Sequence, residues 1–210
     1  CCEKAIQIQP NYAVAHNNLG AVLKDLGKYK EAANCCEKAI QIQPNFVNAY
    51  RNLGLIFLEL GDIQKAINYY QKLSQIQPNP EKAHQNLGRL YVMLGDMRKA
   101  INSYEEAVKC NPENLFNYYH LSKLKKEILN VNLKNEINKI INNKDIKKRN
   151  LAYGNFLLSS YELEAKNYKK EFNYLLKGHF YYFDSEKKKF ENEVEYWLNV
   201  LPKIKELVNF

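Results

Sequence analysis

The sequence repeats itself every 34 residues, and this period constrains the fold more than any other feature. Four kinds of marker keep the spacing: a proline, a Leu-Gly pair, a single glycine and an alanine. They are Pro10, Pro44, Pro78 and Pro112; Leu19-Gly20, Leu53-Gly54 and Leu87-Gly88; Gly27, Gly61 and Gly95; and Ala32, Ala66 and Ala100. A period of this length is typical of a solenoid in which each unit packs on its neighbours.

Each marker has a structural reason, and together they predict one antiparallel helix pair per period. We expect a first helix over residues 13–26 and a second over residues 29–42. Gly20 has no side chain, so the two helices can approach closely, and Gly27 ends the first helix in a turn. Pro44 ends the second helix because it cannot continue the hydrogen-bond ladder. The chain is therefore expected to be all-α.

The order of the markers resembles that of the tetratricopeptide-repeat (TPR) family. In that family a large residue precedes Leu-Gly, and an apolar residue, Ala, an aromatic residue, Ala and Pro follow. Here the large residue is His16, Tyr50 or His84, and the apolar residue is Leu23, Phe57 or Tyr91. The resemblance implies a right-handed superhelical solenoid of antiparallel helix pairs. It covers residues 1–114, as a partial repeat 1–10 and full repeats 11–44, 45–78 and 79–112.

The rest of the chain keeps the phase of the repeat but loses its markers. Residues 115–149 are predicted to form a degenerate helix pair followed by a charged hinge over 143–149. Residues 150–210 are predicted to be TPR-like helices that form a degenerate C-terminal helical cap, with Lys166 where the turn glycine is expected. A separate last helix starting at Glu191 is expected to carry an apolar stripe. That stripe consists of Val194, Trp197 and Leu201, before Pro202.

Residues 150–210 also resemble the stretch that bacterial TPR-linked sulfotransferases place before their transferase core. The matching features are Phe156 to Ser159, Tyr168, Phe172, Leu175-Leu176, His179 to Phe183, and Glu195 to Trp197. This resemblance implies the substrate-presenting arm of a protein-tyrosine-sulfotransferase-like enzyme whose core is missing from the chain. The sequence opens within a repeat, so we expect it to be a bacterial fragment.

Asparagines directly before the Leu-Gly pairs are the best candidate for a binding site. Asn18, Asn52 and Asn86 each offer a donor and an acceptor in one plane, which matches a peptide bond. Neighbouring helices lie about 8–10 Å apart and an extended chain advances about 3.3 Å per residue, so one Asn could bind every third peptide unit. His120 takes this place in the next unit. The alternative is that the period reflects only the abundance of Asn.

This series of asparagines resembles the one in the TPR domain of O-GlcNAc transferase, which implies a groove for an extended peptide or protein segment. An O-GlcNAc-transferase-like arm is therefore a second alternative to a stand-alone scaffold. The wider predicted groove adds five residues on the same helices: Asn17, Arg51, Lys82, Gln85 and Arg89.

The sequence predicts no catalytic site, metal site or cofactor. Six of the eight glycines are repeat markers, so no glycine-rich phosphate loop is expected. The histidines have no nucleophile or carboxylate partner at a recognisable spacing, and His16 and His84 are expected to pack. The five cysteines include no C-x-x-C pair and indicate reduced thiols in the cytoplasm. A parent transferase remains the alternative to a protein that is not an enzyme.

Charge and aromatic content raise the question of a nucleic-acid partner. Most of the net charge of +8 lies after Asn114, and the run 179–190 mixes aromatic residues with lysines on which bases could stack. We interpret the lysines as a solvated helix surface and expect the aromatic residues of the run to pack inward. A protein or peptide is the expected partner, apolar runs are too short for a membrane span, and the oligomeric state is left open.

Overall fold

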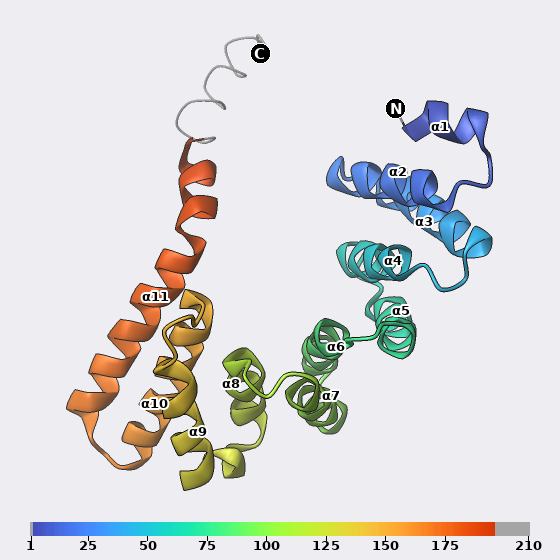
Figure 1. Cartoon of the computed structure of the whole chain (residues 1–210). Coiled ribbons are helices and arrows are strands. Elements are labelled where there is room, and N and C mark those ends of the chain that lie inside the picture. Colours follow the sequence, from blue (N-terminus) through green and yellow to red (C-terminus); the bar gives the residue numbers. More distant parts are fainter. Residues whose placement is uncertain (1, 196–210) are drawn as a thin grey trace. The chain divides into compact units, whose positions relative to one another are not determined.

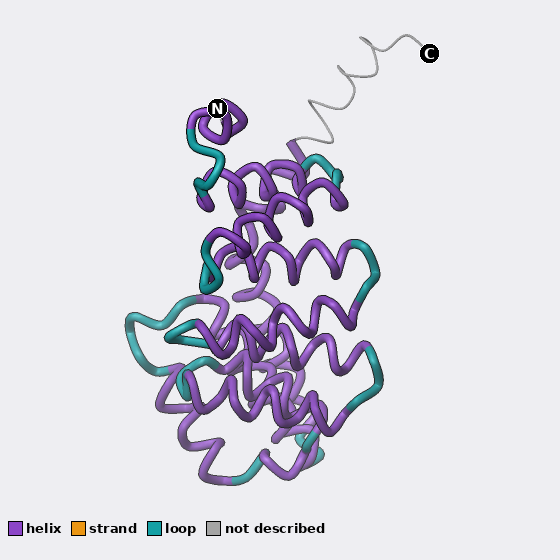
Figure 2. Tube along the Cα trace, turned by 90° about the vertical axis from the view of Figure 1, so that its right-hand side faces the viewer, coloured by secondary structure: helices purple, strands orange, loops and turns teal. Residues whose placement is uncertain are grey.

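The computed structural model describes residues 2–195 and divides the chain into two compact units. The first unit ends at Pro112 and the second begins at Glu113. Figure 2 shows helices joined by turns throughout the described residues, with no strand among them. The all-α prediction is therefore confirmed for this part of the chain.

The first unit is a stack of helix pairs (Figure 1). Its helices are α1 (Cys2–Ile8), α2 (Ala13–Asp25), α3 (Tyr29–Ile42), α4 (Val47–Glu59), α5 (Ile63–Ile76), α6 (Glu81–Met93) and α7 (Met97–Cys110). Helices α2 and α3, α4 and α5, and α6 and α7 pack as pairs, and α3 and α5 also pack against the first helix of the following pair. The predicted helices over 13–26 and 29–42 are confirmed, since α2 ends one residue early and α3 keeps both bounds.

The glycine of each Leu-Gly pair is a point of close helix contact. A Cβ placed on Gly54 would lie 2.7 Å from the ring of Tyr70, and one on Gly88 would lie 2.7 Å from the ring of Tyr104. These rings fill the space that the glycines leave, and they are 1% and 2% exposed. The close approach predicted for Gly20 is present as well, because its Cβ would lie 2.5 Å from the sulfur of Cys36.

The turn inside each pair uses the second glycine. Gly61 has a φ of +76°, its amide donates to the Leu58 carbonyl at 3.0 Å, and the next amide donates to the Phe57 carbonyl at 2.9 Å. This pair of bonds satisfies carbonyls at the end of α4 and requires the left-handed conformation that glycine adopts without strain. Asp62 then begins α5, because its Oδ1 accepts from the Lys65 amide at 3.0 Å.

The second unit consists of four α-helices and one short 3₁₀ helix in the described residues. They are α8 (Leu115–Leu124), η1 (Lys126–Ile128), α9 (Val131–Ile141), α10 (Lys148–Glu164) and α11 (Tyr168–Glu195). Helix α10 is central, since it packs against α8, α9 and α11. Leu115, Ile137 and Leu157 are fully buried and form the core between these helices.

Two predicted boundaries in this unit are wrong. The hinge over 143–149 is shorter than expected, because Lys148 and Arg149 form the first turn of α10 and make ion pairs with Asp184 and Glu186 of α11. Helix α11 also runs without a break through Glu191, so no separate helix starts there. The sequence offers no proline or glycine between Gly178 and Pro202 that would interrupt it. The side chain of Val194, and Trp197, Leu201 and Pro202, lie outside the described residues.

The turn between α10 and α11 repeats the turn of the first unit without a glycine. Lys166 has a φ of +55°, and among the described residues it is the single non-glycine residue with positive φ. Its amide donates to the Leu163 carbonyl at 3.0 Å, and the Asn167 amide donates to the Glu162 carbonyl at 2.9 Å. Asn167 then accepts from the Lys170 amide at 3.3 Å, as Asp62 does from Lys65. Helices α10 and α11 thus form a pair of the repeat type.

Candidate functional site

Amide side chains connect two neighbouring helices of the first unit. Asn52 on α4 donates from Nδ2 to Oδ1 of Asn17 on α2 at 2.9 Å. Asn17 in turn donates from Nδ2 to Oδ1 of Asn18 at 3.4 Å. Asn17 is 5% exposed, Asn52 is half-buried and Asn18 is exposed. The buried amide therefore orients the two side chains that were predicted to bind a peptide.

Two of the remaining predicted groove residues have partners on their own helix. Arg51 donates to Oδ1 of Asn48 at 3.0 Å. Gln85 donates to Oε1 of Glu81 at 3.1 Å, and Asn111 donates to Oε2 of this buried carboxylate at 3.0 Å. Gln85 thus lies in a hydrogen-bonded group that joins α6 to the end of α7.

The other residues of the predicted groove are more accessible. Asn86 on α6 is half-buried, and Lys82 and Arg89 on the same helix are exposed. The positive charges of Arg89 and Arg51 also influence the pKa of the buried Tyr70 hydroxyl. Burial raises the pKa of this hydroxyl to about 12, while the two arginines act in the opposite direction. Tyr70 therefore stays neutral at physiological pH and serves as part of the helix contact.

Residues at the large-residue position of the repeat contact neighbouring parts of the first unit. His16 Nε2 donates to the Pro10 carbonyl at 2.8 Å, and the Tyr50 hydroxyl donates to the Pro44 carbonyl at 2.9 Å. Each bond ties a first helix to the turn that precedes it. Burial lowers the pKa of His84, so its neutral form is favoured. The packing role expected for His16 and His84 stays a prediction.

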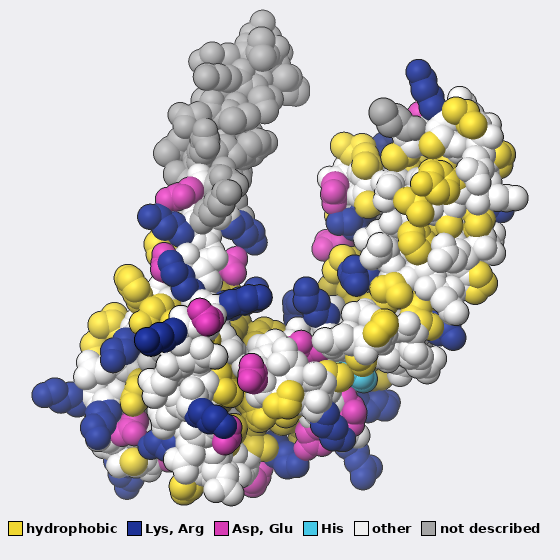
Figure 3. All heavy atoms as spheres, viewed as in Figure 1, with side chains coloured by type: hydrophobic (Ala, Val, Ile, Leu, Met, Phe, Trp, Pro, Cys, Tyr) yellow, Lys and Arg dark blue, Asp and Glu magenta, His cyan; other side chains and the backbone are white. Residues whose placement is uncertain are grey.

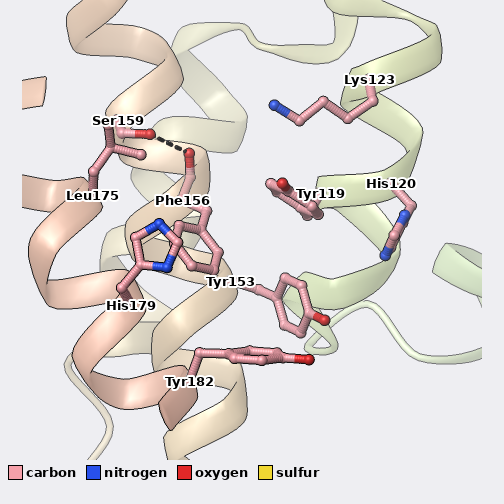
Figure 4. A pocket seen from close by; sticks show the side chains of 9 residues that line it. All are labelled: Tyr119, His120, Lys123, Tyr153, Phe156, Ser159, Leu175, His179 and Tyr182. Carbon is pink, nitrogen blue, oxygen red and sulfur yellow. Dashed lines mark hydrogen bonds between the residues drawn. The ribbon is translucent and has the colours of Figure 1, made fainter.

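His120 lies on α8, in the second unit. Its ring packs at a tilt against that of Phe116, with ring centroids 4.2 Å apart, and meets Tyr119 edge-on at 5.3 Å. It also lines a pocket of about 350 Å³ between α8, α10 and α11 (Figure 4). Sequence reasoning missed this pocket.

The aromatic run on α11 contributes to the pocket and to the surface. His179 and Tyr182 line the pocket, whereas Phe180 is 65% exposed and Phe183 is 54% exposed. The expectation that the aromatic residues of this run pack inward is therefore wrong for these two phenylalanines. Among the described residues α11 packs mainly against α10, so side chains on its other sides stay exposed.

A metal site, a reactive Cys36 thiol and a membrane-spanning helix have no support in the described part of the chain. It contains no group of three or more His, Cys, Asp or Glu side chains that could hold a metal ion. Burial raises the pKa of the Cys36 thiol to about 12, so this cysteine is an unreactive core residue as expected. None of the helices described here is both long enough and apolar enough to span a bilayer.

Stacked helix pairs with glycine contacts and capped turns define a helical-repeat solenoid. The family model of the tetratricopeptide repeat matches residues 11–79 and 47–113. Residues 11–113 are therefore tetratricopeptide repeats, a fold that is typically not catalytic, and the predicted resemblance is confirmed over this range.

Among solved structures the chain resembles that of YrrB, described as a TPR protein with an unusual peptide-binding site. The two share 15% sequence identity over 86% of this chain and 92% of YrrB, with a TM-score of 0.60, which supports the likeness in fold alone. The sequence matches no curated protein. These comparisons give no support to the sulfotransferase-linked resemblance or to the O-GlcNAc-transferase alternative, and both stay predictions.

Proposed function

We propose that the first unit is a protein-interaction scaffold that binds an extended peptide segment through Asn18, Asn52 and Asn86. The observation that carries this proposal is the hydrogen-bonded series from Asn52 through Asn17 to Asn18. It orients Asn52 through a 2.9 Å bond and Asn18 through a longer one of 3.4 Å before any ligand arrives. A side chain that is already ordered loses less conformational entropy on binding, so its hydrogen bonds contribute more to affinity.

The remaining hydrogen-bonding capacity of these amides suits a peptide backbone. Asn52 uses one N–H toward Asn17 and keeps its carbonyl oxygen and second N–H for a ligand. Asn18 uses its oxygen toward Asn17 and keeps its NH₂ group. Backbone amides carry no side-chain identity, so we expect broad recognition by this surface. The fold likeness to YrrB, which is described as having a peptide-binding site, is consistent with this proposal.

A peptide array with matched variants tests the proposal. The test variant replaces Asn18, Asn52 and Asn86 by Ala. The chain offers a matched control, because Asn34, Asn68 and Asn102 have the same 34-residue period on α3, α5 and α7 and are exposed. Labelled parent and both triple variants are applied to an array of unrelated 15-residue peptides at low and high salt.

We expect the groove variant to lose signal across the array and the control variant to keep it. Each lost hydrogen bond is worth about 0.5–1.5 kcal/mol, which is a factor of roughly 2 to 13 in affinity per site. Salt should change the signal little, because the contacts are between uncharged groups. Equal binding by the parent and the groove variant would show that these asparagines do not hold the peptide.

A further inference from the structure

The pocket in the second unit occupies positions that correspond to the asparagine surface of the first. By the 34-residue period, Tyr119 and His120 on α8 take the places of Asn17 and Asn18. Phe156 on α10 also takes the place of Asn17 when the turn at Lys166 is matched to the turn at Gly27. Asn17 and Asn18 are hydrogen-bonded amides, whereas Tyr119, His120 and Phe156 carry aromatic rings. The two surfaces therefore suit different ligand chemistry.

Aromatic rings form most of the pocket wall. The ring centroids of Tyr119 on α8 and Phe156 on α10 are 5.8 Å apart, and Tyr153 lies beside both, at 5.3 Å from Tyr119 and 6.2 Å from Phe156 (Figure 4). His179 of α11 meets Phe156 edge-on at 5.0 Å. The volume of about 350 Å³ lies at the small end of the range for ligand pockets, about 300–1,000 Å³, and suits one large side chain.

The electrostatics of the pocket favour an acidic ligand. None of its lining residues is acidic, and Lys123 extends from α8 at its edge, with its Nζ 5.0 Å from the Tyr119 ring centroid. The nearest acidic residues that follow the pocket along α11, Asp184 and Glu186, are ion-paired with the start of α10. A cation next to uncharged rings and without a carboxylate partner in the described residues attracts a carboxylate.

An apolar stripe on α11 continues from the pocket onto the surface. It consists of Tyr168, Phe172, Leu176, Phe180 and Phe183, each at least half exposed. Figure 3 shows hydrophobic side chains exposed along the first half of α11. The pocket residue His179 lies three and four residues from two members of the stripe, so the surfaces adjoin. The stripe is about 22 Å long at 1.5 Å per residue, which is more than a small molecule covers.

We propose that the second unit binds a peptide segment that places one aromatic or bulky aliphatic side chain in this pocket and an adjacent carboxylate against Lys123. The flanking peptide residues lie along the apolar stripe of α11. This inference rests on the proposed scaffold function and adds its side-chain specificity. The amides of the first unit bind backbone, and the pocket of the second unit selects an acidic segment with a large apolar residue.

Three blocked tripeptides probe the pocket separately from the first unit. Their sequences are Glu-Trp-Glu, Lys-Trp-Lys and Glu-Ala-Glu, and each is titrated into the full isotope-labelled chain while amide NMR shifts are followed. We expect Glu-Trp-Glu to bind with a dissociation constant below about 1 mM. Its shifts should concentrate on α8, α10 and α11, and both other peptides should bind at least about tenfold more weakly.

Two charge reversals locate the site. Lys123→Glu replaces an attraction by a repulsion and should weaken Glu-Trp-Glu about tenfold while raising the affinity of Lys-Trp-Lys. Lys177→Glu makes the same change at an exposed site of α11 that does not line the pocket, and it should change affinity less than threefold. Both lysines are exposed, so the variants should melt at the parent's temperature.

The outcomes separate this inference from the proposed function. The variant without Asn18, Asn52 and Asn86 should bind Glu-Trp-Glu like the parent even if it fails on the peptide array. Loss of tripeptide binding in that variant would place the site in the first unit and overturn the pocket assignment. Equal affinity for Glu-Trp-Glu and Glu-Ala-Glu, equal effects of the two lysine reversals, or no binding at 1 mM would overturn it as well.

Discussion

Substitution of Lys166 by glycine provides a quantitative test of the structure. The same Lys→Gly change is predicted to stabilise the α10–α11 pair at this site and to destabilise it at Lys177. Lys166→Gly relieves a side chain held at a φ of +55°. The left-handed conformation costs a non-glycine residue about 1–2 kcal/mol, and glycine loses about 0.5–1 kcal/mol more backbone entropy on folding. The net expectation is a gain of about 0.5–1 kcal/mol for the α10–α11 pair.

The control is Lys177→Gly, an identical change in the middle of α11. Lys177 is exposed and helical, so glycine there should cost about 1 kcal/mol. Hydrogen exchange by mass spectrometry, with α10 and α11 followed as separate peptides, measures the local free energy of opening. Exchange of both helices should slow about two- to fivefold in Lys166→Gly and speed up in Lys177→Gly. Faster exchange in both variants would refute the repeat-type turn.

Two further predictions concern the first unit. Gly54→Ala should lower the free energy of unfolding by about 1–2 kcal/mol in urea titrations. The new methyl group would lie 2.7 Å from the buried Tyr70 ring, and this overpacking outweighs the better helix propensity of Ala. An unchanged free energy of unfolding would contradict the close helix contact. Backbone and side-chain hydrogen bonds to Lys65 lower the pKa of Asp62 in the folded state, so its capping contribution is present above the unfolded pKa and lost as pH falls through the folded one. Acid-induced loss of melting temperature should therefore be smaller in Asp62→Ala than in the parent, and equal loss would contradict the cap.

The repeat unit could be predicted from sequence because its markers report local physics. Gly61 is needed for a positive φ, and Gly54 for the approach of the Tyr70 ring, wherever the unit lies in the solenoid. The turn at Lys166 could not be recognised in the same way. Its hydrogen bonds are between backbone groups, and a lysine side chain gives no sign of a left-handed conformation.

The candidate sites depend on helix packing and were only partly predictable. The period placed Asn18 and Asn52 at matching positions, but the bond from Asn52 to Asn17 joins residues 35 apart and depends on how α2 and α4 are rotated. The pocket draws on the pair α10 and α11 and on α8, which residues 125–147 separate from α10 in the sequence. Its aromatic residues look like core residues in the sequence, because the pattern does not show which face of α11 packs against α10.

The central claim is that a peptide backbone lies across the amides of α2, α4 and α6, and their side-chain NMR signals test it most directly. A peptide that binds in the array is added to the labelled chain, and the side-chain NH₂ resonances of Asn18, Asn52 and Asn86 are followed. We predict that all three shift in proportion to the bound fraction, while those of Asn34, Asn68 and Asn102 stay in place. Unchanged groove resonances at saturation, or equal shifts in both sets, would contradict the claim.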